Sequence, residues 1–278
     1  MIKHRFLPPA AGVFEPVKLG IMVFLVSFSS LLCPARHASA GYSNELWQVR
    51  KSVHFKVYYK SDPEHYVDSV IERAEDYYDS ITEKLGFRRF NYWTWDNACT
   101  INLYSSREDY LRSTNHPEWS GGSANIRKRS IDTFFHASDF LETTLPHEMT
   151  HLIFREFVGY DRWLPLWLDE GIACSQEKEG GQYVAIARVL VKTNMFIKLD
   201  KLTEITKSGL FMPEVFYAES AAVVEFLLQQ YGGEKFIDFC RALRDNKLNK
   251  DWKSFFIEIY GFKNIPEMGE RWKAYLLK

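Results

Sequence analysis

An alternation of apolar and polar residues marks the first ordered part of the chain. It runs through residues 53–59, and both this segment and Cys99–Tyr104 are rich in β-branched and aromatic residues, which is typical of half-buried strands. Between them, apolar residues recur at helical spacing over 63–85, and Gly86 follows where a helix would end. Ser106 is placed to cap a second helix. This order of strand, helix, strand and helix predicts a sheet with helices packed against it.

The pattern changes twice in the rest of the chain. Residues 120–125 have the composition of a loop, and 126–135 could form an exposed strand at the sheet edge. Beyond residue 141 the periodicity predicts helices at 142–158, 165–178, 182–197, 217–231, 234–246, 251–260 and 265–278. The predicted fold class is α+β, with a small mixed β-sheet and helices in the N-terminal half and a helical C-terminal half. No repeat or Ser/Gly-rich linker divides the sequence, which favours a single unit.

The N-terminus has the features of an export signal. Basic residues at positions 3, 5 and 18 precede an apolar run over 19–32, and the small residues of 38–40 then offer a cleavage site. We therefore interpret 1–40 as a signal peptide and 41–278 as the mature domain, in a periplasmic or secreted protein. The run is shorter than the roughly 20 residues that a membrane-spanning helix needs, so no stable span is expected after cleavage, although a retained N-terminal anchor is an alternative.

Composition narrows the class of protein further. The apolar fraction of 46% and the charged fraction of 26% are those of a globular protein, and the formal net charge of -1 does not favour a nucleic acid partner. Three cysteines remain in the mature segment, Cys99, Cys174 and Cys240. A domain of this size does not need disulfides, so we expect buried thiols, with a single bridge as the alternative.

The chemistry is concentrated in the predicted helix over 142–158. It contains His147-Glu148-Met149-Thr150-His151, an H-E-x-x-H pattern in which the two histidines lie one turn apart on the same face. Both imidazoles could then reach one metal ion. Pro146 would break a helix interior, so we expect the helix to begin near Thr143, with Thr143 or Thr144 as the cap and Pro146 in the first turn.

A catalytic zinc ion takes three protein ligands and keeps one position open, so a third donor is required. Glu170 follows His151 with eighteen residues between them, inside the apolar helical stretch Trp167-Leu168-Asp169-Glu170-Gly171-Ile172-Ala173. An unpaired carboxylate in such a stretch would be costly, and a metal would explain its presence. Turn residues over 159–165 let the second helix fold back on the first. The predicted zinc ligands are therefore His147, His151 and Glu170.

The HEMTH motif, the eighteen-residue gap and WLDEGIA resemble the zinc signature of the gluzincin metallopeptidases, in particular aminopeptidase N-type enzymes with W-L-N-E-G-F-A. Residues 216–220 and 231–233 are also similar to the C-terminal part of small bacterial peptidase MA-like domains. The likeness covers about 141–235 and implies a zincin active-site helix. It implies peptide hydrolysis with Glu148 as the general base. Tyr217 would then be the candidate donor to the oxyanion, although it could equally be a packing tyrosine.

Two positions depart from those families. The aminopeptidases bind the free substrate amine through a G-x-M-E-N motif, whereas 121–125 here reads GGSAN and has no acid, so an endopeptidase is favoured over an aminopeptidase. Asn125 and its edge strand could bind a peptide by strand addition or could simply face solvent. Cys174 stands where thermolysin-like relatives carry an aspartate that orients a zinc-bound histidine, which leaves that role unassigned.

The sequence as a whole predicts a zinc-dependent peptidase acting on peptide or protein substrates. Two alternatives stay open at this level. One is an exported, non-catalytic binding or assembly protein in which the metal is structural. The other is hydrolysis of a different amide, such as a cell-wall crosslink.

Overall fold

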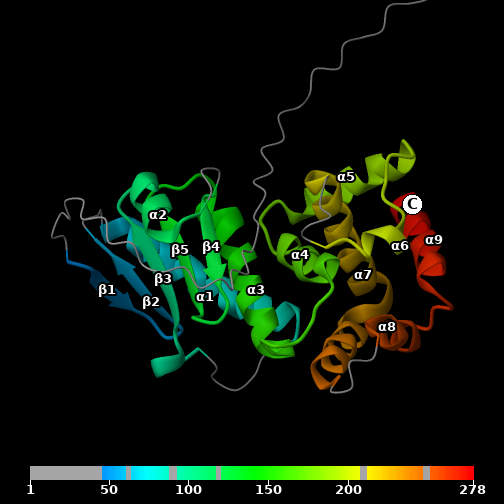
Figure 1. Ribbon diagram of the computed structural model, residues 1–278, viewed down its shortest axis with the longest axis horizontal. Helices are drawn as coiled ribbons and strands as arrows, with labels where there is room; N and C mark the ends of the chain where they lie inside the picture. Colours follow the sequence, from blue (N-terminus) through cyan, green and yellow to red (C-terminus); the bar gives the residue numbers. More distant parts are fainter. Residues whose placement is uncertain (1–45, 61–63, 88–92, 117–119, 207–211, 247–250) are drawn as a thin grey trace, which may run out of the picture.

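A computed structural model describes residues 46–60, 64–87, 93–116, 120–206, 212–246 and 251–278. The predicted signal peptide 1–40 lies outside these residues. The predicted α+β class is confirmed, since a mixed sheet occupies one side of Figure 1 and a helical half occupies the other, with helix α3 next to the sheet. The strands are β1 (Gln48–Lys51), β2 (Phe55–Tyr59), β3 (Cys99–Tyr104), β4 (Gly122–Asn125) and β5 (Ser130–Phe134).

The sheet has the order β1-β2-β3-β5-β4, in which β2, β3 and β5 are parallel and the two outer strands are antiparallel to their neighbours. Residues in register across it share a face, as Val57, Ile101 and Ile131 do, and these three side chains are fully buried. Helices α1 (Glu64–Lys84) and α3 (Leu145–Val158) contact each other and pack against β2 and β4. Helix α2 (Arg107–Thr114) contacts β3 and β5.

The local signals for the first two helices are confirmed. Gly86 follows α1 with a φ of 66°, a left-handed conformation in which a side chain would be strained. Ser106 caps α2, and its side chain accepts the Asp109 N–H at 3.1 Å.

Two strand predictions were wrong. The segment 120–125, expected to be a loop, contains β4, and β4 is the edge strand. The segment 126–135, expected to be one exposed edge strand, turns at Arg129 with a φ of 49° before β5, which lies inside the sheet between β3 and β4. Strand β1 was not expected, because its sequence QVRK is polar and largely exposed. Pairing with β5, not side-chain character, makes a strand of the small residues GSAN.

The start of the helix that carries HEMTH also differs from the expectation. Thr144 stands at the N-cap position, but its side chain makes no capping hydrogen bond, because a wider π-helical turn, η2 (Phe140–Thr144), leads directly into α3. Pro146 lies in the first turn of α3, as predicted, directly after this π-helical turn. The carbonyl of Glu142, which lies four residues before the proline and cannot receive a hydrogen bond from it, accepts the Lys178 N–H at 3.0 Å.

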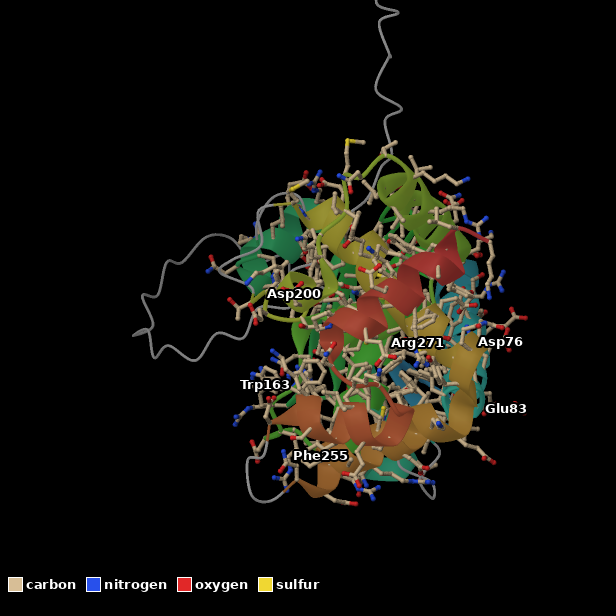
Figure 2. All side chains as sticks on the ribbon, turned by 90° about the vertical axis from the view of Figure 1, so that its right-hand side faces the viewer. Asp76, Glu83, Trp163, Asp200, Phe255 and Arg271 are labelled. Carbon is tan, nitrogen blue, oxygen red and sulfur yellow. The ribbon has the colours of Figure 1, made fainter. Side chains whose placement is uncertain are left out.

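The C-terminal half consists of packed helices, two of which face the viewer in Figure 2, where Phe255 marks α8 and Arg271 marks α9. Gly232, with a φ of 85°, kinks α7 at the predicted boundary between two helices. A single apolar cluster joins the sheet to these helices. No helix among the residues described is both long enough and apolar enough to cross a membrane. The helices are α4 (Leu166–Cys174), α5 (Gly180–Lys192), α6 (Leu199–Leu202), α7 (Pro213–Asp245), α8 (Trp252–Tyr260) and α9 (Ile265–Leu276).

Candidate metal centre

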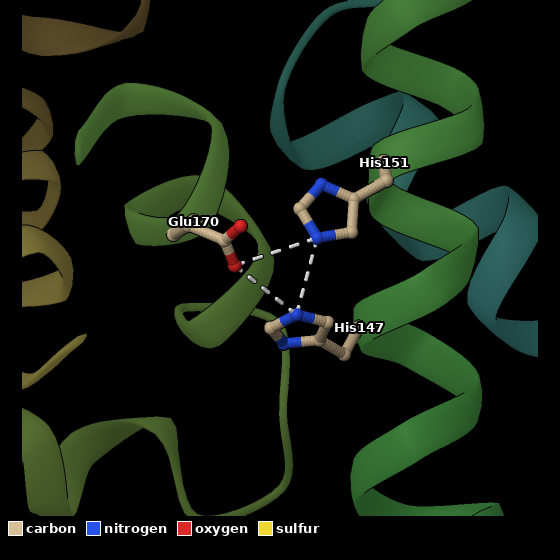
Figure 3. Close-up of side chains that lie close together, drawn as sticks. All are labelled: His147, His151 and Glu170. Carbon is tan, nitrogen blue, oxygen red and sulfur yellow. Dashed lines mark hydrogen bonds and ion pairs between the residues drawn. The ribbon is translucent and has the colours of Figure 1, made fainter. Parts of the chain in front are cut away.

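Helices α3 and α4 bring the three predicted ligands together. His147 and His151 lie one turn apart on α3, and Glu170 reaches toward them from α4 (Figure 3). The two Nε2 atoms are 3.1 Å apart, and each lies 3.6 Å from Oε2 of Glu170. All three residues are almost completely buried. Two histidines from one turn of α3 and one glutamate from α4 therefore form a triangle of donor atoms.

This triangle fits a small divalent cation. Tetrahedral zinc with nitrogen and oxygen ligands separates neighbouring donor atoms by roughly 3.3–3.6 Å, close to the separations found here. Among the described residues, Oε2 of Glu170 is buried without a hydrogen-bond partner. A buried carboxylate oxygen left in this way is costly, and a cation bound at the centre of the triangle would satisfy it. The group of His147, His151 and Glu170 is thus suited to hold a metal ion.

The position of α4 depends on a close contact with α7. A side chain at Gly171, the residue after Glu170, would collide with the backbone carbonyl group of Ser220 on α7, whose carbon atom lies 2.7 Å from the point where a Cβ would stand. Glycine lets the two helices approach at this point. Pro165, at the N-cap of α4, helps turn the chain back after α3. These two features set where Glu170 meets the histidines.

Each histidine is held from behind by a carboxylate, a feature that the sequence analysis did not identify. Nδ1 of His151 lies 3.0 Å from Oδ1 of Asp169, whose other oxygen accepts hydrogen bonds from Arg155. Nδ1 of His147 lies 2.8 Å from Oε1 of Glu177. Such partners fix the ring orientation of a metal-binding histidine and leave Nε2 directed at the ion. The signal for Asp169 was its place beside Glu170 in a buried stretch, whereas Glu177 gave no local signal.

The charges of the site shift the pKa values of its own residues. Burial alone would lower the pKa of His151, but the charges of Asp169 and Glu170 raise it to about 9. Burial would likewise raise the pKa of Glu170, and the positive charges of His151 and His147 lower it instead. The metal-free site therefore favours a charged carboxylate beside a protonated imidazole. Binding of a cation must displace those protons.

Glu148 is anchored to the edge of the sheet. Its Oε2 accepts the backbone N–H of Ala124 on β4 at 2.9 Å, and its side chain is buried. Burial raises the pKa of Glu148, although the positive charges of His147 and His151 oppose the shift. The strand that was expected to be a loop thus anchors the carboxylate of Glu148.

Tyr217 and Cys174 both lie near the ligand group. Tyr217, on the first turns of α7, is buried, and its pKa is raised by burial and then by the negative charges of Glu170 and Glu148. Cys174 forms a compact group with His147 and Glu177, with ligand atoms within 4.8 Å of one another. Within the described part of the chain, Cys99, Cys174 and Cys240 are all buried free thiols, as predicted. Asn125, at the end of β4, is exposed.

Comparison with known proteins agrees with this geometry. A family model for the Peptidase MA superfamily matches residues 95–278, which is more than half of the chain and includes α3, α4 and α7. No curated protein matches the sequence. A match of this extent, together with a buried group of two histidines and a glutamate on adjacent helices, assigns the chain to the Peptidase MA superfamily, a family of peptidases.

Proposed function

We propose that this protein is a zinc-dependent peptidase whose metal is held by His147, His151 and Glu170. The observation that carries the proposal is the triangle of their donor atoms, with sides of 3.1, 3.6 and 3.6 Å, in which one corner is Oε2 of Glu170, a buried oxygen without a hydrogen-bond partner. Two imidazoles and one carboxylate form a ligand set that zinc hydrolases use, and it leaves one position for substrate or water.

Zinc bound at this group would polarise the scissile carbonyl and lower the pKa of water. Proton transfer and stabilisation of the oxyanion fall to side chains of the protein. Glu148, with its raised pKa and its hydrogen bond from Ala124, is suited to take a proton from the attacking water and pass it to the leaving amine. Tyr217 is the proposed donor to the negative oxygen that forms on the carbonyl.

Endopeptidase action is favoured over aminopeptidase action. Strand β4 reads GSAN and offers no carboxylate to bind a free amino terminus. Two acids beside the ligand group, Asp169 and Glu177, are already engaged because each contacts an imidazole. The residues over 1–40 support export of the protein, so peptides or proteins outside the cytoplasm are the proposed substrates.

The test is the Glu148→Gln variant, measured against an unstructured protein substrate. We expect zinc content and melting temperature close to the parent, because the amide oxygen can still accept the Ala124 N–H, and cleavage lower by about 100- to 10,000-fold. Glu83→Gln, at an exposed position on α1 labelled in Figure 2, is the control and should behave as the parent. Equal cleavage by the Glu148→Gln variant and the parent would exclude the proposed mechanism. A parent that binds zinc but cleaves no substrate would instead favour the non-catalytic binding protein.

A further inference from the structure

The carboxylate behind His147 comes from an unexpected place in the chain. Cys174 is the residue one turn beyond Glu170 on α4, and the acid that meets Nδ1 of His147 is Glu177, in the turn that follows this helix. We propose that Glu177 is the positioning residue of His147 and that Tyr183 holds Glu177 in place. This inference rests on the proposed metal site, but it concerns different residues.

Both oxygens of Glu177 have a defined partner. Oε1 lies 2.8 Å from Nδ1 of His147, and Oε2 accepts the hydroxyl of Tyr183, on α5, at 2.9 Å. Glu177 is 8% exposed, so its carboxylate is largely withdrawn from water. A buried carboxylate is costly unless it is hydrogen-bonded on both sides, as it is here. Hydrogen bonds therefore connect Tyr183 to Glu177 and Glu177 to His147, whose Nε2 faces the proposed metal.

The turn that carries Glu177 is fixed to the helix that carries His147. The Lys178 N–H donates to the Glu142 carbonyl just before α3, and the Gly180 N–H donates to the Glu177 carbonyl at 2.9 Å. A Cβ at Gly180 would stand 2.9 Å from the carbonyl oxygen of Cys174, so the tight turn needs glycine there. The Glu177 N–H also donates to the Cys174 carbonyl at 3.3 Å, so backbone hydrogen bonds hold the turn on both sides of Glu177.

The pairing has a chemical reason. An imidazole that gives its Nδ1–H to a carboxylate keeps the Nε2 lone pair for the metal, and the carboxylate makes the ring a better ligand. A thiol at position 174 is a weak hydrogen-bond acceptor and cannot supply this effect while neutral. Asp169 performs the same task for His151 from within α4. The two histidines are thus oriented by acids from two separate segments.

A second metal ion bound by His147, Cys174 and Glu177 is the competing interpretation, because their ligand atoms lie within 4.8 Å of one another. The hydrogen-bond distance between Nδ1 and Oε1 and the tyrosine on the other oxygen favour the positioning role. The number of zinc ions bound per chain separates these two interpretations.

The experiment measures zinc affinity by competition with a chelating dye, with the full chain of each variant. We expect Glu177→Ala to weaken zinc binding by about 10- to 100-fold. Glu177→Gln, whose amide oxygen can still accept the Nδ1–H, should fall between Glu177→Ala and the parent, and Tyr183→Phe should weaken binding less than Glu177→Ala. Glu179→Ala, at an exposed position two residues away, is the matched control and should bind as the parent does.

The double variant Cys174→Asp with Glu177→Ala provides a rescue. Residue 174 lies in the same group as His147, so an aspartate there should recover most of the lost affinity, which a general loss of structure could not produce. The inference is overturned if Glu177→Ala binds zinc within twofold of the parent. It is also overturned if the parent binds two zinc ions and both Glu177→Ala and Cys174→Ser bind one. A parent that binds no zinc would refute the proposed function itself, which keeps the two failures distinct.

Discussion

Ionisable side chains are unusually concentrated in the interior of this protein. His147, Glu148, His151 and Glu170 are all nearly inaccessible to solvent, and Asp169 and Glu177 stand directly behind the histidines. Charges in such a place interact more strongly than in water, and each needs a partner. Glu148, Asp169 and Glu177 each accept at least one hydrogen bond. Oε2 of Glu170 accepts none, and the proposed cation would satisfy it.

Tyr217 is the residue whose role is most open to a direct test. Its hydroxyl lies within electrostatic range of Glu170 and Glu148, both of which raise its pKa. If it donates to the oxyanion, Tyr217→Phe should lower kcat by about 100- to 1,000-fold with little change in KM, because the hydrogen bond forms only as charge develops. Zinc content should stay at the parent level. A kcat within twofold of the parent would show that Tyr217 only packs.

At the scale of elements, α4 is the helix on which the site depends. It carries Glu170 and Asp169 on successive residues, so Glu170 would ligate the proposed metal while Asp169 contacts His151 from behind. The position of α4 in the protein is set by its contacts with α3 on one side and α7 on the other. The positions of the ligands are therefore as sensitive to helix packing as to the identity of the ligand residues.

Gly171→Ala tests that dependence. The added methyl would meet the backbone of Ser220, which cannot move without shifting α7, so we expect a loss of about 1–3 kcal/mol in unfolding free energy. Zinc affinity should fall as well, because α4 would carry Glu170 away from the histidines. Gly181→Ala is the control, since a Cβ there meets no atom within 4 Å and alanine favours helix. Similar urea midpoints for both variants would contradict this view of the α4–α7 contact.

A second element-scale contact predicts a dependence on pH. Glu219 on α7 is fully buried and accepts the Ile197 N–H, in the segment between α5 and α6, at 2.9 Å. Burial raises the pKa of Glu219 to about 8, although this hydrogen bond opposes the shift. Between the ordinary value of 4.5 and about 8, the folded chain holds a proton that the unfolded chain has released. Stability attributable to Glu219 therefore falls as pH rises through this window and is constant above it.

Glu219→Gln removes this titration. The difference in unfolding free energy between variant and parent should move in favour of the variant from pH 5 to pH 9, by an amount on the order of a few kcal/mol. Urea titrations of both proteins at several pH values would measure it. A difference that stays constant across that range would show that the carboxyl is not protonated in the folded protein.

Over the whole molecule, one apolar core runs from the sheet into the C-terminal helices, and the ligand group lies on α3 and α4 where these halves meet. Strand β4 is connected to the ligand group as well, because the Ala124 N–H donates to the side chain of Glu148, the residue after His147. Metal binding should consequently stabilise the folded chain as a unit.

Removal of the metal tests this coupling. Free zinc at about 100 times its dissociation constant should add about 2.7 kcal/mol to the unfolding free energy and raise the melting temperature by several degrees, and excess chelator should reverse the effect. His151→Asn should melt at the same temperature with and without zinc. If neither zinc nor chelator changes the melting temperature of the parent, the proposed metal site is wrong.

The sequence alone determined those features that depend on near neighbours. Helical periodicity located most of the helices, Ser106 began one and Gly86 ended another as expected, and the spacing of His147 and His151 placed both imidazoles on one face of a helix. Such patterns can be read from residues one or two turns apart because local backbone geometry fixes their relative positions.

Only the tertiary structure decided the rest. GSAN becomes a strand because β5 pairs with it. The π-helical turn before Pro146 includes Glu142, whose carbonyl cannot receive a hydrogen bond from the proline, and the Lys178 N–H, 36 residues further along the chain, donates to it. Glu177 meets His147, thirty positions earlier in the sequence, only after α4 has folded back. These contacts depend on how elements pack in space, and no local run of residues encodes that packing.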